Sequence, residues 1–301
     1  PRLETPDTFI LENKLVKVEF DDISMGIKSF IIKKTGEEII SDKRPAGFYY
    51  IEEDPGKKMT AWCIGRYMSE TLLNKNILVT EVSRNKDDLK QWISYEQEFK
   101  SSKLKIKVAL EKDSSQIKYE AECDWQERAV VGKIIPQLNF RIPLAYEVDQ
   151  FKYDVPFGTI IREPFRQDVP ANSWMTGINE KDTYSAMIIT NNKYGFRGYD
   201  STLSVTLLRS PYDPDPYPDN GVQKFKFAVS AEIEKSEKQL IKKGYIYNHP
   251  LSFISNKIHD GEFEMDKSFM EVISTNAVVS SVKRAEDYES AVAIRLYETE
   301  G

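Results

Sequence analysis

LSVTLLRSPYDPDPYPDNGVQKFKF, residues Leu203–Phe227, is the stretch around which the rest of the chain can be organised. It begins as a strand, because apolar residues alternate with polar ones at Leu203, Val205 and Leu207. Arg209 ends that strand. Proline fixes φ and lacks an N–H donor, so regular structure stops at Pro211, Pro214, Pro216 and Pro218. Asn220-Gly221 is a turn signal before a second alternating strand. The stretch therefore predicts a hairpin with a stiff, acidic loop and an arginine where the first strand meets that loop.

The same period of two recurs at regular spacing along the chain, with polar breaks between the segments. These predicted strands are Leu11–Phe20, Ile27–Ile32, Phe48–Ile51, Ile77–Val82, Trp92–Phe99, Leu104–Leu110, Ile117–Cys123, Tyr184–Thr190, Phe269–Ile273, Ala277–Lys283 and Ala291–Tyr297. A good helical signal occurs at Ser230–Lys243, with Gly244 at the position after the helix end. The pattern predicts a mainly β fold, a large antiparallel β-sandwich with one short helix. Because no linker or repeat divides the sequence, we expect one domain over residues 1–301.

Composition excludes several classes of protein. The 301 residues carry 42 Lys and Arg against 48 Asp and Glu, a net charge of −6, which argues against a nucleic-acid partner. No apolar run approaches the ~18 residues of a membrane helix and no signal peptide is visible, so we expect no membrane partner. Cys63 and Cys123 are expected to be buried free thiols, which fits a reducing compartment and a cytoplasmic location. Because the chain starts with Pro1, we expect a piece of a longer protein.

The residues by themselves carry no strong catalytic or metal signature. Asp213, Asp215 and Asp219 lack the regular spacing of a calcium loop, and His249 and His259 lack zinc-site spacing. No nucleophile elbow, P-loop or dinucleotide fingerprint occurs. Glycoside hydrolysis needs two carboxyl groups at a set separation, and nothing in the spacing of the 48 acidic residues selects a pair. We therefore expect neither a metal nor a cofactor in this chain.

Several blocks, taken in order, resemble one known family. The LLRSPYDPDPYPDNG run at Leu207–Gly221 is similar to a signature in the C-terminal β domain of glycoside hydrolase family 38, the α-mannosidases. Similar blocks occur at Leu11–Ile40, Ala61-Trp62, Asp124–Glu127, Pro156–Gly158, Asn192–Gly195 and Val278–Glu298. The resemblance covers nearly the whole chain and implies a galactose-mutarotase-like β-sandwich, the supersandwich fold. Cys63 stands where the family usually has an aspartate, and Gln223 where it usually has a histidine.

The resemblance also implies a function. Family α-mannosidases are retaining enzymes whose catalytic zinc and aspartate nucleophile belong to an N-terminal α/β barrel, and that barrel is not in this sequence. The chain would then be a non-catalytic C-terminal domain that supports the barrel and lines its substrate cleft. The parent enzyme would hydrolyse α-mannosides in mannose and glycan catabolism. The implied partners are the missing catalytic domain and an α-mannoside or mannose-containing oligosaccharide.

Five residues are the candidates for facing the cleft or the barrel: Arg209, Tyr212, Asp215, Asp219 and Trp62. Prolines restrict the shape of the Tyr212–Asn220 loop, and arginine suits bidentate contact with a carboxylate or with sugar hydroxyl groups. Trp62 is either a sugar-stacking platform or a core or interface aromatic. The alternative for Arg209 is that it pairs with Asp213 or Asp215 and only stiffens its own loop.

Two other classes of function stay open at the level of sequence. One is a stand-alone carbohydrate-binding or mutarotase-type module, although a mutarotase needs a positioned acid and base, commonly His and Glu. With only His249 and His259 available, both outside predicted strands, that chemistry is weakly supported. The other is a purely structural or interaction domain.

Overall fold

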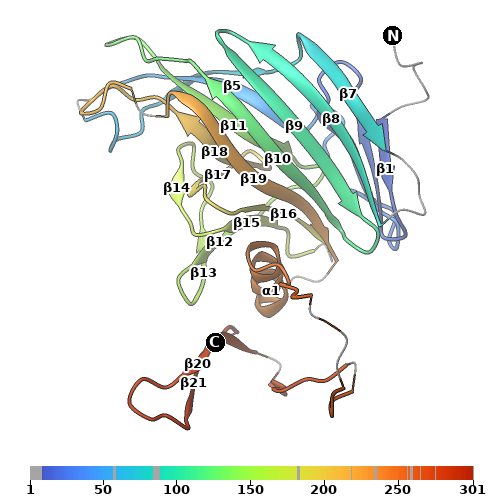
Figure 1. Cartoon of the computed structure of the whole chain (residues 1–301). Coiled ribbons are helices and arrows are strands. Elements are labelled where there is room, and N and C mark those ends of the chain that lie inside the picture. The colour runs from blue at the N-terminus through green and yellow to red at the C-terminus, as the bar shows by residue number, and fades with distance from the viewer. Residues whose placement is uncertain are drawn as a thin grey trace.

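The computed structural model describes residues 9–56, 59–83, 89–181, 184–217, 219–233, 236–255, 257, 260–264, 266–274 and 276–300. These residues form antiparallel sheets and one helix, α1 (Glu237–Asn248) (Figure 1). The fold is therefore mainly β, as predicted. Pro218 and His259 lie outside the described residues.

The larger layer is a nine-stranded sheet that mixes distant parts of the chain. Its order is β13 (Gly158–Arg162), β12 (Gln150–Val155), β15 (Trp174–Ile178), β16 (Ser185–Thr190), β19 (Gly221–Glu232), β10 (Gln116–Trp125), β9 (Ser102–Glu111), β8 (Lys90–Phe99) and β7 (Ile77–Ser83). β19 lies at its middle, between β16 and β10. On one side of β19 the strands β10, β9, β8 and β7 form a meander, and on the other side β16, β15, β12 and β13 form a second group, so one later strand joins the two groups.

The second layer is a six-stranded sheet. Its order is β14 (Val169–Pro170), β17 (Gly195–Tyr199), β18 (Thr202–Arg209), β11 (Ile135–Pro143), β5 (Gly47–Glu53) and β6 (Tyr67–Leu72). A four-stranded sheet adds β1 (Phe9–Glu12), β2 (Val16–Phe20), β3 (Ile27–Ile32) and β4 (Glu37–Glu38), and the C-terminal hairpin pairs β20 (Ala277–Arg284) with β21 (Val292–Glu298). Buried residues of the three larger sheets belong to one core.

Four aromatic rings join the two main layers. Phe48 and Phe140 come from the six-stranded sheet, and Tyr119 and Phe227 from the nine-stranded sheet. The rings of Tyr119 and Phe227 are stacked with centroids 4.6 Å apart, and Phe140 lies 4.7 Å from Phe227. Each side chain is at most 6% exposed. This packing of one sheet on another confirms the predicted sandwich.

The predicted hairpin at Leu203–Phe227 is wrong. β18 pairs with β11 and β17, whereas β19 pairs with β10 and β16, so the two strands belong to different sheets. Pro211, Pro214 and Pro216 have no N–H for a ladder, which lets the strands separate between them. The proline-rich loop is therefore a crossover from one layer to the other.

Two other strand boundaries differ from the prediction. Leu11–Phe20 is split into β1 and β2, because the Asn13 carboxamide accepts hydrogen bonds from the N–H groups of Leu15 and Val16 and makes a turn. Phe269–Ile273 is not a strand. Its terminal side chains are 81% and 90% exposed, so the segment lacks the burial that stabilises a paired strand.

The helix occurs later than its propensities predict. Ser230 and Glu232 continue β19, pairing with Gln116 and Ser185, because sheet pairing outweighs the weak preference of single residues for helix. Gly244 lies inside α1 and does not end it. Leu240 and Ile241 pack on the outer face of the nine-stranded sheet, in a cluster with Trp174, Met187, Ile189 and Ala228.

We expect Gly244→Ala to destabilise the protein, although alanine is the better helix former by about 1 kcal/mol. A Cβ at position 244 would lie 2.5 Å from Cδ1 of Trp174, whose side chain is 1% exposed. Overpacking of this kind typically costs about 1–3 kcal/mol. Urea unfolding of the variant should therefore give a lower free energy of unfolding, with Lys242→Ala on the exposed side of α1 as the control. A gain in stability would show that Trp174 moves aside freely.

Candidate functional site

Two loops interlock at one end of the sandwich, and Figure 1 shows them together at the upper left. The first is the described residues 54–56 and 59–66 between β5 and β6, and the second is the described residues 210–217, 219 and 220 between β18 and β19. The fully buried hydroxyl of Thr60 accepts hydrogen bonds from the N–H groups of Tyr212 and Asp213, each 3.1 Å long. The backbone carbonyl of Asp213 accepts a 2.9 Å hydrogen bond from the N–H of Ala61, and its carboxylate accepts a 2.8 Å hydrogen bond from the N–H of Met59. These contacts fix each loop against the other.

Arg209 makes a buried bidentate ion pair at the base of the two loops. Its Nε and Nη2 donate to the two carboxylate oxygens of Glu53, both at 2.8 Å. The Glu53 side chain is 0% exposed and that of Arg209 is 14% exposed. Glu53 also accepts 2.5 Å hydrogen bonds from Nε2 of Gln137 and the N–H of Gly65, and Arg209 donates to the carbonyl of Cys63 at 3.1 Å. Both carboxylate oxygens therefore have hydrogen-bond partners as well as a countercharge, as a buried carboxylate requires.

The partner of Arg209 is thus a residue that sequence reasoning missed. The alternative that Asp213 or Asp215 holds Arg209 does not match the structure, since the carboxylate comes from β5 across the sheet. Nothing in the spacing of the chain links Glu53 to Arg209. A glutamate at the end of an otherwise apolar strand was the one available signal, because burying a charge there requires a cation.

The other candidates lie at the same end. Tyr212 is half-buried, while Asp215 and Asp219 are exposed. Oδ1 of Asp215 accepts from the N–H of Tyr217 at 2.9 Å, and Asp219 has a φ of 60° where the loop turns into β19. The Trp62 side chain is 74% exposed, so its interpretation as a core aromatic is wrong. That these side chains face a catalytic domain stays a prediction.

The two cysteines differ from each other. Cys123 is buried in β10, and burial raises the pKa of its thiol to about 12. Cys63 is exposed, so the prediction of two buried thiols is wrong for this residue. The reason is its position beside Trp62 in the loop after β5, where the segment has no sheet to cover it.

The described residues contain no group of three His, Cys, Asp or Glu side chains that could hold a metal ion. No described helix is both long enough and apolar enough to span a membrane.

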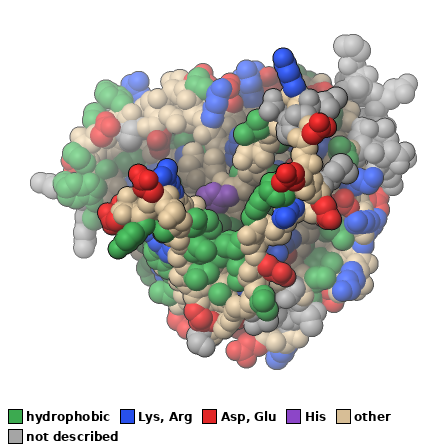
Figure 2. Space-filling view, turned by 60° about the horizontal axis from the view of Figure 1, so that its bottom comes forward, with side chains coloured by type: hydrophobic (Ala, Val, Ile, Leu, Met, Phe, Trp, Pro, Cys, Tyr) green, Lys and Arg blue, Asp and Glu red, His purple; other side chains and the backbone are tan. Residues whose placement is uncertain are grey.

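A second surface is unusually apolar. The segment after α1 exposes Leu251, Phe253 and Ile254 by 89% or more, and Phe269 and Ile273 by 81% or more. Figure 2 shows hydrophobic side chains gathered beside a hollow that contains a histidine, on the face that carries α1 and the C-terminal hairpin. Exposed apolar groups in such number are typical of a surface that packs against another domain or chain.

Comparison with known sequences gives one family. Residues 11–217 match the family described as "Glycosyl hydrolases family 38 C-terminal domain". The chain is 24% identical over 314 aligned positions to alpha-mannosidase 2C1 of Mus musculus and of Homo sapiens. Each alignment covers 99% of this chain and 29% of the relative, so the chain spans less than a third of the length of these proteins.

Solved structures agree on the fold. A glycosyl hydrolase family 38 protein from Enterococcus faecalis superposes with a TM-score of 0.75 and 14% identity, covering 98% of this chain and 40% of that one. At this identity the superposition supports the fold alone, and the sequence match supports the family. The chain belongs to the glycoside hydrolase family 38 C-terminal domain family.

Proposed function

We propose that this chain is the C-terminal domain of a longer α-mannosidase, in which it supports an N-terminal catalytic domain and lines its substrate cleft. The match to α-mannosidases over 99% of the chain but only 29% of the relatives supports a parent protein with further domains. The exposed apolar segment after α1 supports the same conclusion, since a separate domain would cover it. Localisation in the cytoplasm is part of this proposal.

The observation that carries the proposal is the match to α-mannosidases over 99% of this chain and 29% of theirs, and an exposed tryptophan on a hydrogen-bonded loop supports the cleft-lining part. Trp62 is 74% exposed, and its neighbour Cys63 is tied through its carbonyl to Arg209. Thr60 fixes the same loop to the Tyr212 segment. An exposed indole held in place suits stacking on a sugar ring, because a preorganised platform loses little freedom on binding.

The buried carboxylate at this end, Glu53, is not suited to act as one of a hydrolytic pair. Retaining glycosidases place two carboxyl groups about 5–5.5 Å apart, one as nucleophile and one as acid and base. Glu53 is fully buried and paired with Arg209, and its carboxylate oxygens also accept hydrogen bonds from Gln137 and from the N–H of Gly65. It is therefore not available to a substrate. The role of these residues is to hold the two loops, and the catalytic zinc and carboxylates belong to the proposed partner domain.

We predict that the isolated chain does not hydrolyse an aryl α-mannoside, with or without added zinc. Full-length protein carrying the upstream region is the matched control and should turn over at ordinary enzyme rates, roughly 1–1,000 per second. Turnover by the isolated chain in that range would show that it carries a complete catalytic site, and the proposal would be wrong.

A stand-alone carbohydrate-binding module is the second candidate, and the exposed Trp62 is the observation that favours it. Isothermal titration of the isolated chain with mannose and galactose separates the two. Binding that Trp62→Ala abolishes supports the module, whereas binding that appears only in the full-length protein supports the domain.

A further inference from the structure

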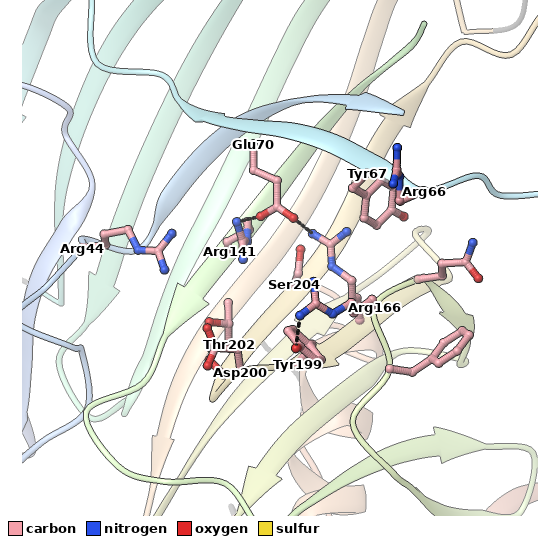
Figure 3. A pocket seen from close by; sticks show the side chains of 13 residues that line it. Arg44, Arg66, Tyr67, Glu70, Arg141, Arg166, Tyr199, Asp200, Thr202 and Ser204 are labelled. Carbon is pink, nitrogen blue, oxygen red and sulfur yellow. Dashed lines mark hydrogen bonds and ion pairs between the residues drawn. The ribbon is translucent and has the colours of Figure 1, made fainter. Parts of the chain in front are cut away.

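A strongly basic pocket lies on the six-stranded sheet; none of the five cleft candidates lines it, although Arg66 at its edge belongs to the first loop of the candidate site. It has a volume of about 400 Å³, within the ~300–1,000 Å³ range of small-molecule sites. Its lining contains five arginines against Glu70 and Asp200, a net charge of +3: Arg44, Arg66, Arg141, Arg166 and Arg197. Arg141 comes from β11 and Arg197 from β17, whereas Arg44, Arg66 and Arg166 come from neighbouring loops, and Figure 3 shows Arg141 near the middle of the pocket beside Glu70. Such an excess of one charge in a concave site attracts an anion.

Arg197 is the deepest of these cations and is not satisfied by the protein. Its side chain is 5% exposed, and the guanidinium lies 4.0 Å from the ring centroid of Tyr67. Nη2 is 3.7 Å from Oε1 of Glu70, beyond hydrogen-bond distance. Neither Nη1 nor Nη2 has a hydrogen-bond partner among the described residues. Buried donors without partners are costly, so their presence at a pocket indicates a ligand that accepts from them.

Arg141 places a second guanidinium beside the first. Its side chain is 12% exposed and forms an ion pair with Glu70, while its Nε has no hydrogen-bond partner among the described residues. Burial first, and then the charge of Arg197, lower the pKa of Arg141 to about 10. Glu70 thus pairs with two buried cations, and a bound anion would relieve their repulsion.

The rim of the pocket adds further donors. Figure 3 shows Arg44 and Arg166 on opposite sides, with the hydroxyls of Thr202 and Ser204 in the lining between them. The guanidinium of Arg166 lies 4.3 Å from the ring centroid of Tyr199 and donates to its hydroxyl, which holds it in place. Arginine forks and hydroxyls together are the donors that recognise the oxygens of phosphate.

We propose that this pocket binds a dianionic oxyanion of the phosphate type, either inorganic phosphate or a phosphate monoester. A single carboxylate would leave most of the +3 lining charge uncompensated. A phosphate group carries about −1.5 to −2 charges at pH 7 and has three strong acceptor oxygens, which match the free nitrogens of Arg197 and Arg141. The site does not depend on the proposed mannosidase function, because none of its residues is among the cleft candidates.

Titration calorimetry of the 301-residue chain at constant ionic strength tests the proposal, with inorganic phosphate, a sugar phosphate and acetate as probes. We expect phosphate to bind at least tenfold more tightly than acetate. Tighter binding of the sugar phosphate than of phosphate would indicate a monoester as the ligand, and equal binding would indicate recognition of the phosphate group alone. At constant ionic strength the electrostatic screening is the same for all three probes, so a difference in affinity reflects the probe itself.

Variants make the test specific. Arg197→Gln should weaken phosphate binding tenfold or more, and Arg44→Gln, at an exposed rim position where folding is not at risk, should weaken it several-fold. Arg295→Gln, an exposed arginine on β21 outside the pocket, is the matched control and should change nothing. The proposal is overturned if phosphate binds no better than acetate, or if Arg44→Gln binds phosphate as tightly as the control Arg295→Gln does.

Discussion

Replacing Arg209 with methionine is expected to lower the free energy of unfolding by about 3–5 kcal/mol, the usual effect of breaking a buried ion pair. The substitution keeps the side chain long and unbranched but leaves the carboxylate of Glu53, 0% exposed, without its bidentate partner. Gln137 and Gly65 would still donate to Glu53, yet neither carries a charge. Equilibrium denaturation in urea measures the loss.

A double-mutant cycle isolates the pair. Adding Glu53→Gln to Arg209→Met removes the buried charge, so the double variant should recover part of the stability that Arg209→Met loses. Arg295→Met, at an exposed position, is the control and should change stability by less than about 0.5 kcal/mol. A loss below about 1 kcal/mol for Arg209→Met would mean that the pair is solvated. Because a substitution at Arg209 changes stability, Trp62 is the cleaner position for testing the proposed role in sugar binding.

Phe227→Ala is expected to cost about 3–5 kcal/mol, the usual range for deleting a buried phenylalanine ring. The ring is 0% exposed and lies 4.6 Å from Tyr119, 4.7 Å from Phe140 and 5.9 Å from Phe48, measured between ring centroids. It therefore contacts both layers of the sandwich, and the surrounding sheets limit how far the cavity can collapse.

Val222→Ala on the same strand is the matched control, because Val222 is 60% exposed and its truncation leaves no cavity. Chemical denaturation of both variants should show a large loss of stability for position 227 and a small one for position 222. Equal losses would mean that strand pairing in β19, rather than the aromatic core, is the main contribution at these positions.

The period of two predicts this fold well where one face of a strand is buried and the other is not. β8, β9 and β10 follow the predicted segments closely, because buried positions alternate with more exposed ones along most of each strand. The same rule does not say which strands are neighbours. Alternation in Leu203–Phe227 is equally compatible with a hairpin and with strands in two layers, and the pairing of β18 with β11 and of β19 with β10 decides between them.

The candidate site was predictable only in part. The proline-rich loop carries a local signal of rigidity, whereas the sequence around Trp62 does not decide between an exposed and a core side chain; the structure brings both to one end of the sandwich. Glu53 and the basic pocket depend on contacts between strands far apart in the sequence, such as Arg141 with Glu70. The preference of single residues for helix or strand does not indicate such pairs, and one sequence alone contains no other information on which distant residues are in contact.

The central place of β19 affects how this chain can be synthesised or shortened. Both halves of the nine-stranded sheet are complete before residue 221 leaves the ribosome, and β10 and β16 then present open edges. Unpaired edges of that length invite pairing with other chains. Truncation at residue 217, where the family match ends, would make this exposure permanent, because β19 pairs with all ten residues of β10. The natural boundary of the folding unit is therefore later than the boundary of the family signature.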